Sequence, residues 1–287
     1  MLYALVFDEE SYEYLLNKKL ENLIPISFKE YDDYYKTSKE KFDDAKQYYF
    51  SATPNLCLYL LEKFKEIDIL LYLDADVYLF NSLNTLYDEF GNSSIGICPH
   101  RLHPILRFLS KDHGRFNVGV NLFRNSDESR RCLADWKVEC DGWYKCKSGY
   151  HLEYFSNQIF LNDWIGKYKE IKVIENIGVD VAPWNAANYN FSFQSNEFLV
   201  NGKPIIIYHF SALKRIAHDK WNGNTIIYYA SIKGSLLELY RKYINEIENY
   251  NLMTESYAEI KLSKNIGKRL FYSIMRVFLN ETITIRK

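Results

Sequence analysis

The hydrophobic positions of this 287-residue chain form short continuous runs, separated by stretches in which apolar residues recur every three or four positions. Continuous apolar runs predict buried strands, and the three-to-four spacing predicts helices between them. The expected strands are Leu2–Phe7, Leu23–Phe28, Ile69–Leu73, Ser94–Cys98, a run within Asp112–Phe123, Ile171–Ile174 and Pro204–Tyr208. Because continuous apolar strands alternate with helices, the pattern predicts an α/β fold with a mostly parallel sheet flanked by helices.

The expected helices lie between these strands and after the last of them. Those between the strands include Glu10–Leu20, Ser126–Cys140 and about 155–164. Thr53–Phe64 opens with a Thr followed by Pro54, which is typical of an N-cap and a first helical position, so we expect a helix to begin there. The last part of the chain again has helical spacing. We therefore divide the chain into an α/β domain, residues 1–224, and a helical C-terminal extension, residues 225–287.

Composition narrows the class of protein only moderately. Lys and Arg total 36 while Asp and Glu total 37, so the charge balance predicts no nucleic-acid partner. The five Cys are irregularly spaced and have no matching His pattern, which favours free buried thiols over disulfides or a zinc site. No apolar stretch approaches the roughly 20 residues of a membrane span, and no secretory signal precedes the first strand. We therefore expect a cytoplasmic protein.

Residues 264–279 form a basic amphipathic segment. Its sequence contains Lys and Arg but no acidic residue, and helical spacing places its apolar side chains on one face: Ile266, Leu270, Phe271, Ile274 and Phe278. Such a helix lies on an anionic membrane surface or packs against its own domain, and the sequence leaves both open. In the first case the protein would be peripheral on the inner face of the membrane.

Two carboxylates, Asp74 and Asp76, directly follow the apolar strand Ile69–Leu73. Side chains two positions apart share one face of a strand, and open α/β sheets bind their ligands at the carboxyl ends of their strands. Two like charges held there are either hydrated or compensated by a hard divalent cation such as Mn²⁺ or Mg²⁺. A phosphatase-type nucleophilic Asp is excluded because Tyr78 stands where that pattern has Thr.

The order of the motifs that follow favours the cation. The chain resembles the GT-A glycosyltransferases akin to glycogenin and the lipopolysaccharide galactosyltransferases (family 8), and it is most similar to a group of bacterial nucleotide-diphospho-sugar transferases. The segments that carry the resemblance are Tyr72–Asp76, Gly114–Gly119, Asn157–Trp164, Ala182–Asn185 and Tyr208–Lys214. The resemblance implies a GT-A fold and a nucleotide-diphosphate sugar, in the first place a UDP-sugar, as co-substrate. It further implies sugar transfer to a glycan or lipid-linked acceptor in bacterial surface polysaccharide synthesis.

The same resemblance implies a cation site and a donor site. Asp74, Asp76 and His209 would hold Mn²⁺ or Mg²⁺, and Asp74 would also lie near the donor ribose. Lys214 would contact the leaving diphosphate as a point charge. Trp184 would either stack on a sugar face or fill the core.

The candidates for the reacting side of the sugar are amide residues. An oxocarbenium-like transition state is favoured by nearby amide or carboxylate oxygens. These candidates are Asn117, Asn157, Gln158 and Asn185, although Asn is also a common residue of turns and caps. His100 and Arg101 would overhang the same sheet edge, and we expect them to be a surface pair rather than acceptor contacts.

Three features depart from the family pattern. Asn157 stands where the relatives have Asp, and Ala212 stands where a Gly is expected. The first nucleotide-binding strand is expected to be missing, because Met1 leads directly into what resembles the second strand of the relatives. These departures motivate an alternative function, a degenerate non-catalytic protein that binds sugar nucleotides or acts as a scaffold. A nucleotidyltransferase is disfavoured because no Gly-rich phosphate loop follows the first strand.

Overall fold

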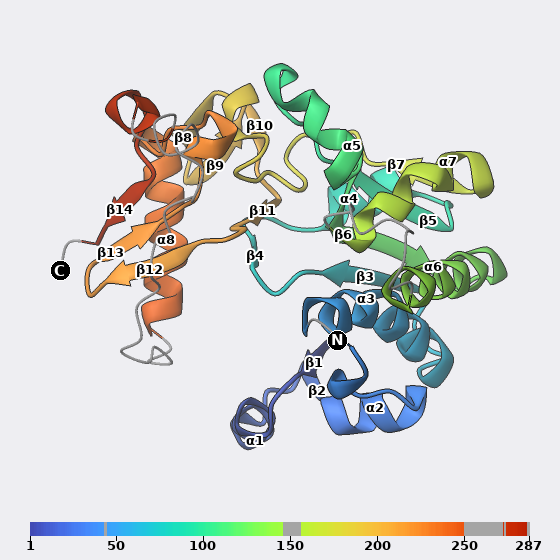
Figure 1. Ribbon diagram of the computed structural model, residues 1–287. Coiled ribbons are helices and arrows are strands. Elements are labelled where there is room, and N and C mark those ends of the chain that lie inside the picture. Colours follow the sequence, from blue (N-terminus) through green and yellow to red (C-terminus); the bar gives the residue numbers. More distant parts are fainter. Residues whose placement is uncertain (43–44, 146–155, 250–271, 273, 286–287) are drawn as a thin grey trace.

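The computed structural model describes residues 1–42, 45–145, 156–249, 272 and 274–285. Figure 1 shows one lobe that is built on a four-stranded sheet and a second lobe in which short strands surround one long helix. The order in the four-stranded sheet is β3-β6-β5-β7. These strands are β3 (Ile69–Leu73), β5 (Ile95–Pro99), β6 (Phe116–Arg124) and β7 (Ile171–Val173). The expected mixed α/β class is confirmed.

The direction of β6 departs from the expected mostly parallel sheet. β5 pairs parallel with β7, but β6 runs antiparallel to both β3 and β5, so only β3, β5 and β7 share one direction. A parallel neighbour requires a long crossover, usually a helix that packs back across the sheet. The connection from β5 to β6 contains only the short helices η2 (Pro104–Leu109) and α5 (Ser110–His113). The chain therefore returns beside β5 in the opposite direction.

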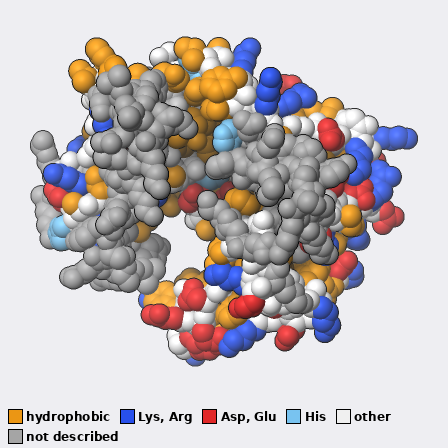
Figure 2. All heavy atoms as spheres, in the orientation of Figure 1, with side chains coloured by type: hydrophobic (Ala, Val, Ile, Leu, Met, Phe, Trp, Pro, Cys, Tyr) orange, Lys and Arg blue, Asp and Glu red, His pale blue; other side chains and the backbone are white. Residues whose placement is uncertain are grey.

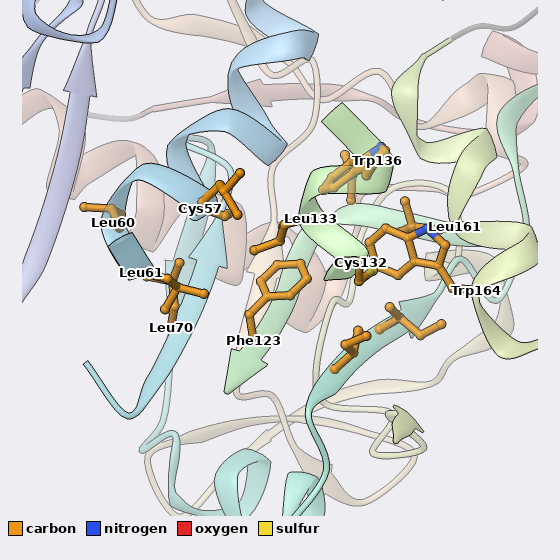
Figure 3. Close-up of a cluster of buried hydrophobic side chains, with 14 of the residues drawn as sticks. Cys57, Leu60, Leu61, Leu70, Phe123, Cys132, Leu133, Trp136, Leu161 and Trp164 are labelled. Atoms are coloured by element: carbon orange, nitrogen blue, oxygen red, sulfur yellow. The ribbon is translucent and has the colours of Figure 1, made fainter. Parts of the chain in front are cut away.

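Helices cover both faces of this sheet. The helices α3 (Ala45–Lys63) and α6 (Asp127–Lys145) pack with one face, and α4 (Asn84–Phe90) packs with the other. Figure 3 shows the first cluster, in which Phe123 of β6 lies among side chains of α3 and α6. The neighbouring residue Leu122 belongs to the cluster on the α4 side, and both side chains are fully buried. Strand alternation thus produces two cores from one sheet.

The first two strands form a sheet of their own. β1 (Leu2–Val6) pairs parallel with β2 (Leu23–Ser27), and α1 (Glu9–Lys18) connects them. The chain then forms α2 (Phe28–Tyr35) and η1 (Lys39–Lys41) before α3. Both predicted strands and the helix between them are confirmed.

The remaining strands lie in the second lobe or between the two lobes (Figure 1), and the sequence did not predict most of them. They form the sheet β10-β9-β8, the sheet β12-β13-β14 and the pair β11-β4. Their bounds are β4 (Val77–Leu79), β8 (Phe191–Gln194), β9 (Glu197–Val200), β10 (Lys203–Pro204), β11 (Ile207–His209), β12 (Lys214–Ala217), β13 (Lys220–Asn222) and β14 (Thr282–Thr284). The expected last strand Pro204–Tyr208 is therefore divided between β10 and β11, and it is not the last.

The helix expected near the C-terminus is present as α8 (Gly234–Asn249). Its buried side chains, among them Leu236 and Tyr240, pack in one cluster with Tyr208 and Trp221. This cluster contains residues from both sides of position 224, and the domain division placed there stays a prediction. The remaining short helices are η3 (Asn157–Asp163), α7 (Trp164–Lys167), η4 (Ala186–Asn188) and η5 (Ile226–Tyr228).

The basic segment 264–279 lies mostly outside the described residues. Of its described side chains, Ile274 is 50% exposed and Phe278 is 77% exposed. None of the helices in the described ranges has both the length and the apolar character needed to cross a membrane.

The helix α3 begins earlier than its sequence predicts. The Thr-Pro pair was expected to start it, but the helix runs from Ala45 and contains Pro54 in its interior. Proline has no amide hydrogen, so the carbonyl of Phe50, four residues earlier, loses its normal donor. The side-chain amide of Asn157 donates to this carbonyl at 2.7 Å. A residue far along the chain thus satisfies the acceptor that Pro54 leaves free.

We predict that Asn157 and Pro54 are energetically coupled. Asn157→Ala should destabilise the protein by about 2 kcal/mol, because a buried carbonyl loses its donor. In a Pro54→Ala background the restored amide hydrogen supplies that donor, so the same substitution should cost about 1 kcal/mol less. Urea unfolding of the four proteins of the cycle measures this coupling. Equal costs in both backgrounds would show that the two residues act independently.

Candidate active site

Backbone pairing brings Asp74, Asp76 and His209 together. Asp74 follows β3, Asp76 precedes β4, and His209 ends β11, which pairs antiparallel with β4. The amide of Phe210 donates to the carbonyl of Asp76 at 2.7 Å, and the amide of Asp74 donates to the carbonyl of Gly119 on β6 at 3.0 Å. Figure 1 shows β4 and β11 running between the two lobes. The cluster is therefore fixed by main-chain hydrogen bonds at the junction of the lobes.

The three side chains face one another closely. His209 Nε2 lies 2.9 Å from an Asp76 carboxylate oxygen and 3.8 Å from an Asp74 carboxylate oxygen. One ligand atom from each of the three residues can be chosen so that all lie within 4.8 Å of one another. Acidic and histidine side chains are visible together near the centre of the face in Figure 2. The predicted constellation is present in the structure.

The charges in this cluster control its protonation. Burial alone would lower the pKa of His209, but the carboxylates of Asp180 and Asp76 outweigh it and raise that pKa to about 10. Burial raises the pKa of Asp74. Burial acts in the same direction on Asp76, but its hydrogen bond and charge interaction with His209 lower the net pKa of Asp76. The imidazolium therefore supplies the positive charge that compensates the carboxylates in the metal-free protein.

A hydroxyl orients the first carboxylate. The Tyr72 hydroxyl donates to Asp74 Oδ1 at 2.9 Å, and it lies 3.3 Å from the Thr53 hydroxyl of α3. This arrangement links the first carboxylate of the cluster to the helix that covers the sheet.

Gly119 allows the histidine ring to approach the sheet. A Cβ at this position would lie 2.5 Å from His209 Cε1 and 2.7 Å from His209 Nδ1, which is closer than real Cβ contacts. The same atom would lie 2.8 Å from Asn117 Oδ1, which accepts a hydrogen bond from the Gly119 amide at 2.7 Å. The Asn-Val-Gly motif thus makes room for His209, and the Asn117 side chain contacts the Gly119 amide and the His100 ring.

The loop that contains Trp184 and Asn185 packs against the His209 ring. Asn185 accepts from the amide of Ala182 at 2.9 Å and donates to the carbonyl of Asp180 at 3.0 Å. Trp184 is buried and makes an edge contact with His209, with ring centroids 5.0 Å apart. Both residues therefore shape the loop around the histidine.

Asp180 is a site residue that sequence reasoning missed. Its carboxylate is fully buried, and Oδ1 lies 3.5 Å from His209 Nδ1. A carboxylate in the apolar run immediately before the Ala-Pro-Trp-Asn motif was the available signal.

His100 and Arg101 were expected to form a surface pair, and that expectation was wrong. His100 is buried, and Arg101 donates hydrogen bonds to backbone carbonyls. His100 is only 6% exposed, and its Nδ1 donates to the carbonyl of Gly114 at 2.9 Å. Burial lowers its pKa to about 4, so the ring is neutral at pH 7. The Arg101 guanidinium donates to the carbonyls of Val179 and Ile174. Backbone carbonyls thus hold both side chains in place through hydrogen bonds.

The other predicted residues lie apart from the cluster or make protein contacts. Asn157 and Gln158 are buried at the start of η3, and Lys214 is exposed at the start of β12. Among the described residues, no hydrogen bond or ion pair joins these three to the Asp-Asp-His cluster. Ala212 has a φ of 58°, a conformation that favours Gly, so the missing family Gly leaves local backbone strain. The thiols of Cys57, Cys98, Cys132 and Cys140 are free and buried, as expected.

Part of the chain matches a known protein family. Residues 4–140, somewhat less than half of the chain, match the model of glycosyl transferase family 8. The uncharacterized protein YfnD of Bacillus subtilis (strain 168) is 22% identical over 253 residues, which cover 87% of this chain and 80% of that protein. The family match confirms the predicted resemblance to family 8, and the enzyme class is a glycosyltransferase.

Solved structures with a similar arrangement include two glycosyltransferases. One is involved in the glycosylation of the major capsid of PBCV-1, with 11% identity, a TM-score of 0.45 and coverage of 74% of this chain and 92% of that chain. The other is the galactosyltransferase LgtC in complex with donor and acceptor sugar analogs, with 20% identity, a TM-score of 0.44 and coverage of 72% and 76%.

We predict that Gly119→Ala destabilises the protein by about 1–3 kcal/mol, because the added Cβ overlaps the buried His209 ring. Gly166→Ala is the matched control, since nothing lies within 4 Å of a Cβ there and the residue is helical. The control should be neutral or slightly stabilising. Urea unfolding followed by circular dichroism compares the two variants. Equal midpoints for both would contradict the close approach of His209 to β6.

Proposed function

We propose that this glycosyltransferase moves a sugar from a nucleotide-diphosphate donor to a glycan or lipid-linked acceptor, and that it requires a divalent cation. The observation that carries the proposal is the convergence of Asp74, Asp76 and His209 within 4.8 Å in a chain that matches family 8. A UDP-sugar is the proposed donor, and surface polysaccharide synthesis is the proposed context. Both come from the sequence resemblance.

The residues of the cluster fit a divalent cation. Two carboxylates and one imidazole are a donor set that Mn²⁺ accepts, and the imidazole favours Mn²⁺ over Mg²⁺. Asp74 and Asp76 carry like charges, and a protonated His209 compensates them when no metal is bound. A bound cation would supply stabilisation of the negative charge that develops on the departing diphosphate.

The surrounding residues then have distinct proposed roles. Lys214, exposed five positions after His209, would reach the leaving diphosphate once the donor is bound. Trp184 would keep the His209 ring in place through its edge contact, and Asn185 would hold the loop that carries it. These two residues would thereby contribute to donor binding indirectly.

The amide residues proposed for the sugar side divide into two groups. The amide of Asn117 contacts Gly119 and His100, and that of Asn157 donates to Phe50, so both are proposed to position the site rather than to contact the sugar. Gln158 stays the candidate for direct contact with the donor sugar. Membrane contact through residues 264–279 and a cytoplasmic location stay predictions.

We predict that Asp76→Asn and His209→Ala each reduce sugar transfer by at least about 100-fold, because each removes a proposed cation ligand. Glu197→Gln on β9, outside the cluster, is the control and should retain full activity. The measurement is a screen of donor hydrolysis and transfer across nucleotide sugars, with and without Mn²⁺. Full activity in both cluster variants would refute the cation site. Donor binding by the wild type without any turnover would instead favour the non-catalytic alternative.

We predict that the affinity for Mn²⁺ rises with pH. The pKa of His209 is raised to about 10 in the metal-free protein, so the ring carries a proton at neutral pH that the cation must displace. Losing one proton per cation makes the apparent affinity increase about tenfold per pH unit below the pKa. Calorimetric titration at pH 6, 7 and 8 measures the slope, and His209→Gln should flatten it. A wild-type affinity that is independent of pH would contradict a protonated His209 that must lose its proton when the cation binds.

A further inference from the structure

The carboxylate of Asp180 is in an unusual situation. It is fully buried, and neither of its oxygens has a hydrogen-bond partner among the described residues. Its backbone has a φ of 58°, which few residues other than Gly adopt. Burying a carboxylate without hydrogen bonds is costly, so its retention requires a nearby charge or a function.

The fold holds this carboxylate beside β11. The amide of Val181 donates to the carbonyl of Ile207 at 3.1 Å, and the amide of His209 donates to the carbonyl of Val181 at 2.7 Å. The side chain of Asn185 donates to the carbonyl of Asp180 at 3.0 Å. Main-chain and side-chain hydrogen bonds thus fix the residue on the side of His209 that faces away from Asp76.

The imidazole lies between carboxylates on both sides. Nε2 faces Asp76 at 2.9 Å, and Nδ1 faces Asp180 at 3.5 Å. Nδ1 is buried and has no hydrogen-bond partner among the described residues, so the Asp180 carboxylate at 3.5 Å is the acceptor nearest to it in that set of ion pairs. A histidine that binds a cation through one nitrogen usually donates its other N–H to a carboxylate or carbonyl, which fixes the ring and its tautomer.

We propose that Asp180 is a positioning residue that keeps the proton of His209 on Nδ1 and thereby directs the Nε2 lone pair at the cation site. The inference rests on the proposed function, because it concerns the same Asp-Asp-His cluster. Asp180 does not contact the cation or the sugar in this arrangement. It acts through the orientation of His209, and no other carboxylate is described on the Nδ1 side of the ring.

Asp180→Asn tests the proposal. Asn tolerates a positive φ and has the same shape, but its amide removes the charge and can present N–H groups to Nδ1. We expect the affinity for Mn²⁺, titrated by electron paramagnetic resonance over a range of pH and corrected for the proton that His209 releases in each variant, to fall by about 10- to 100-fold. The electron spin-echo modulation from an imidazole nitrogen on bound Mn²⁺ should weaken in parallel. The midpoint of urea unfolding without metal should stay within about 0.5 M of the wild type, because His209 keeps Asp76 as a partner.

Glu89→Gln provides a matched control. Glu89 accepts hydrogen bonds from the amides of Glu175 and Asn176 in a neighbouring loop and belongs to no part of the cluster. This variant should bind Mn²⁺ with the affinity and nitrogen modulation of the wild type.

The outcomes separate the inference from the proposed function. Wild-type Mn²⁺ affinity and modulation in Asp180→Asn would overturn the positioning role while leaving the cation site intact. A fall in affinity accompanied by a large fall in the unfolding midpoint would also overturn it, since Asp180 would then serve the fold alone. A wild-type protein that binds no Mn²⁺ would contradict the proposed function and this inference together.

Discussion

The antiparallel pairing of β4 with β11 is the constraint on which the site depends. It places His209 beside the turn that carries Asp74 and Asp76, although the two segments are far apart in the sequence. The turn is also tied to β6 through the amide of Asp74. Because these contacts are made by the main chain, the geometry of the cluster is set by the fold rather than by flexible side chains.

The same pairing concentrates charge around one imidazole. Asp180 is fully buried, whereas Asp74 and Asp76 are partly exposed, and like charges this close together are costly without a compensating positive charge. The raised pKa of His209 meets this requirement in the metal-free protein. A divalent cation would meet it more completely, since it can bind both carboxylates while the imidazole becomes a neutral ligand. Either a proton on His209 or a bound divalent cation can therefore compensate the negative charge of the cluster.

The predictions from sequence succeeded where local pattern determines structure. Apolar runs located β1, β2, β3, β5 and β7, and the order of short motifs identified the three residues of the cluster. They failed where a distant partner decides the outcome. Pro54 lies inside a helix, and the distant Asn157 satisfies the carbonyl that Pro54 leaves without a donor. The direction of β6 and the hairpins of the second lobe depend on connections whose path the pattern of apolar residues does not encode. Asp180 was missed for the same reason, since only the fold shows that it meets His209.

The most direct test of the central claim is anomalous diffraction at the manganese edge from crystals grown with Mn²⁺ and a nucleoside diphosphate. Our interpretation predicts a single strong peak within about 2.5 Å of both the Asp76 carboxylate and His209 Nε2, with diphosphate oxygens on its open side. A peak elsewhere in the molecule, or none at this cluster under saturating Mn²⁺, would contradict it.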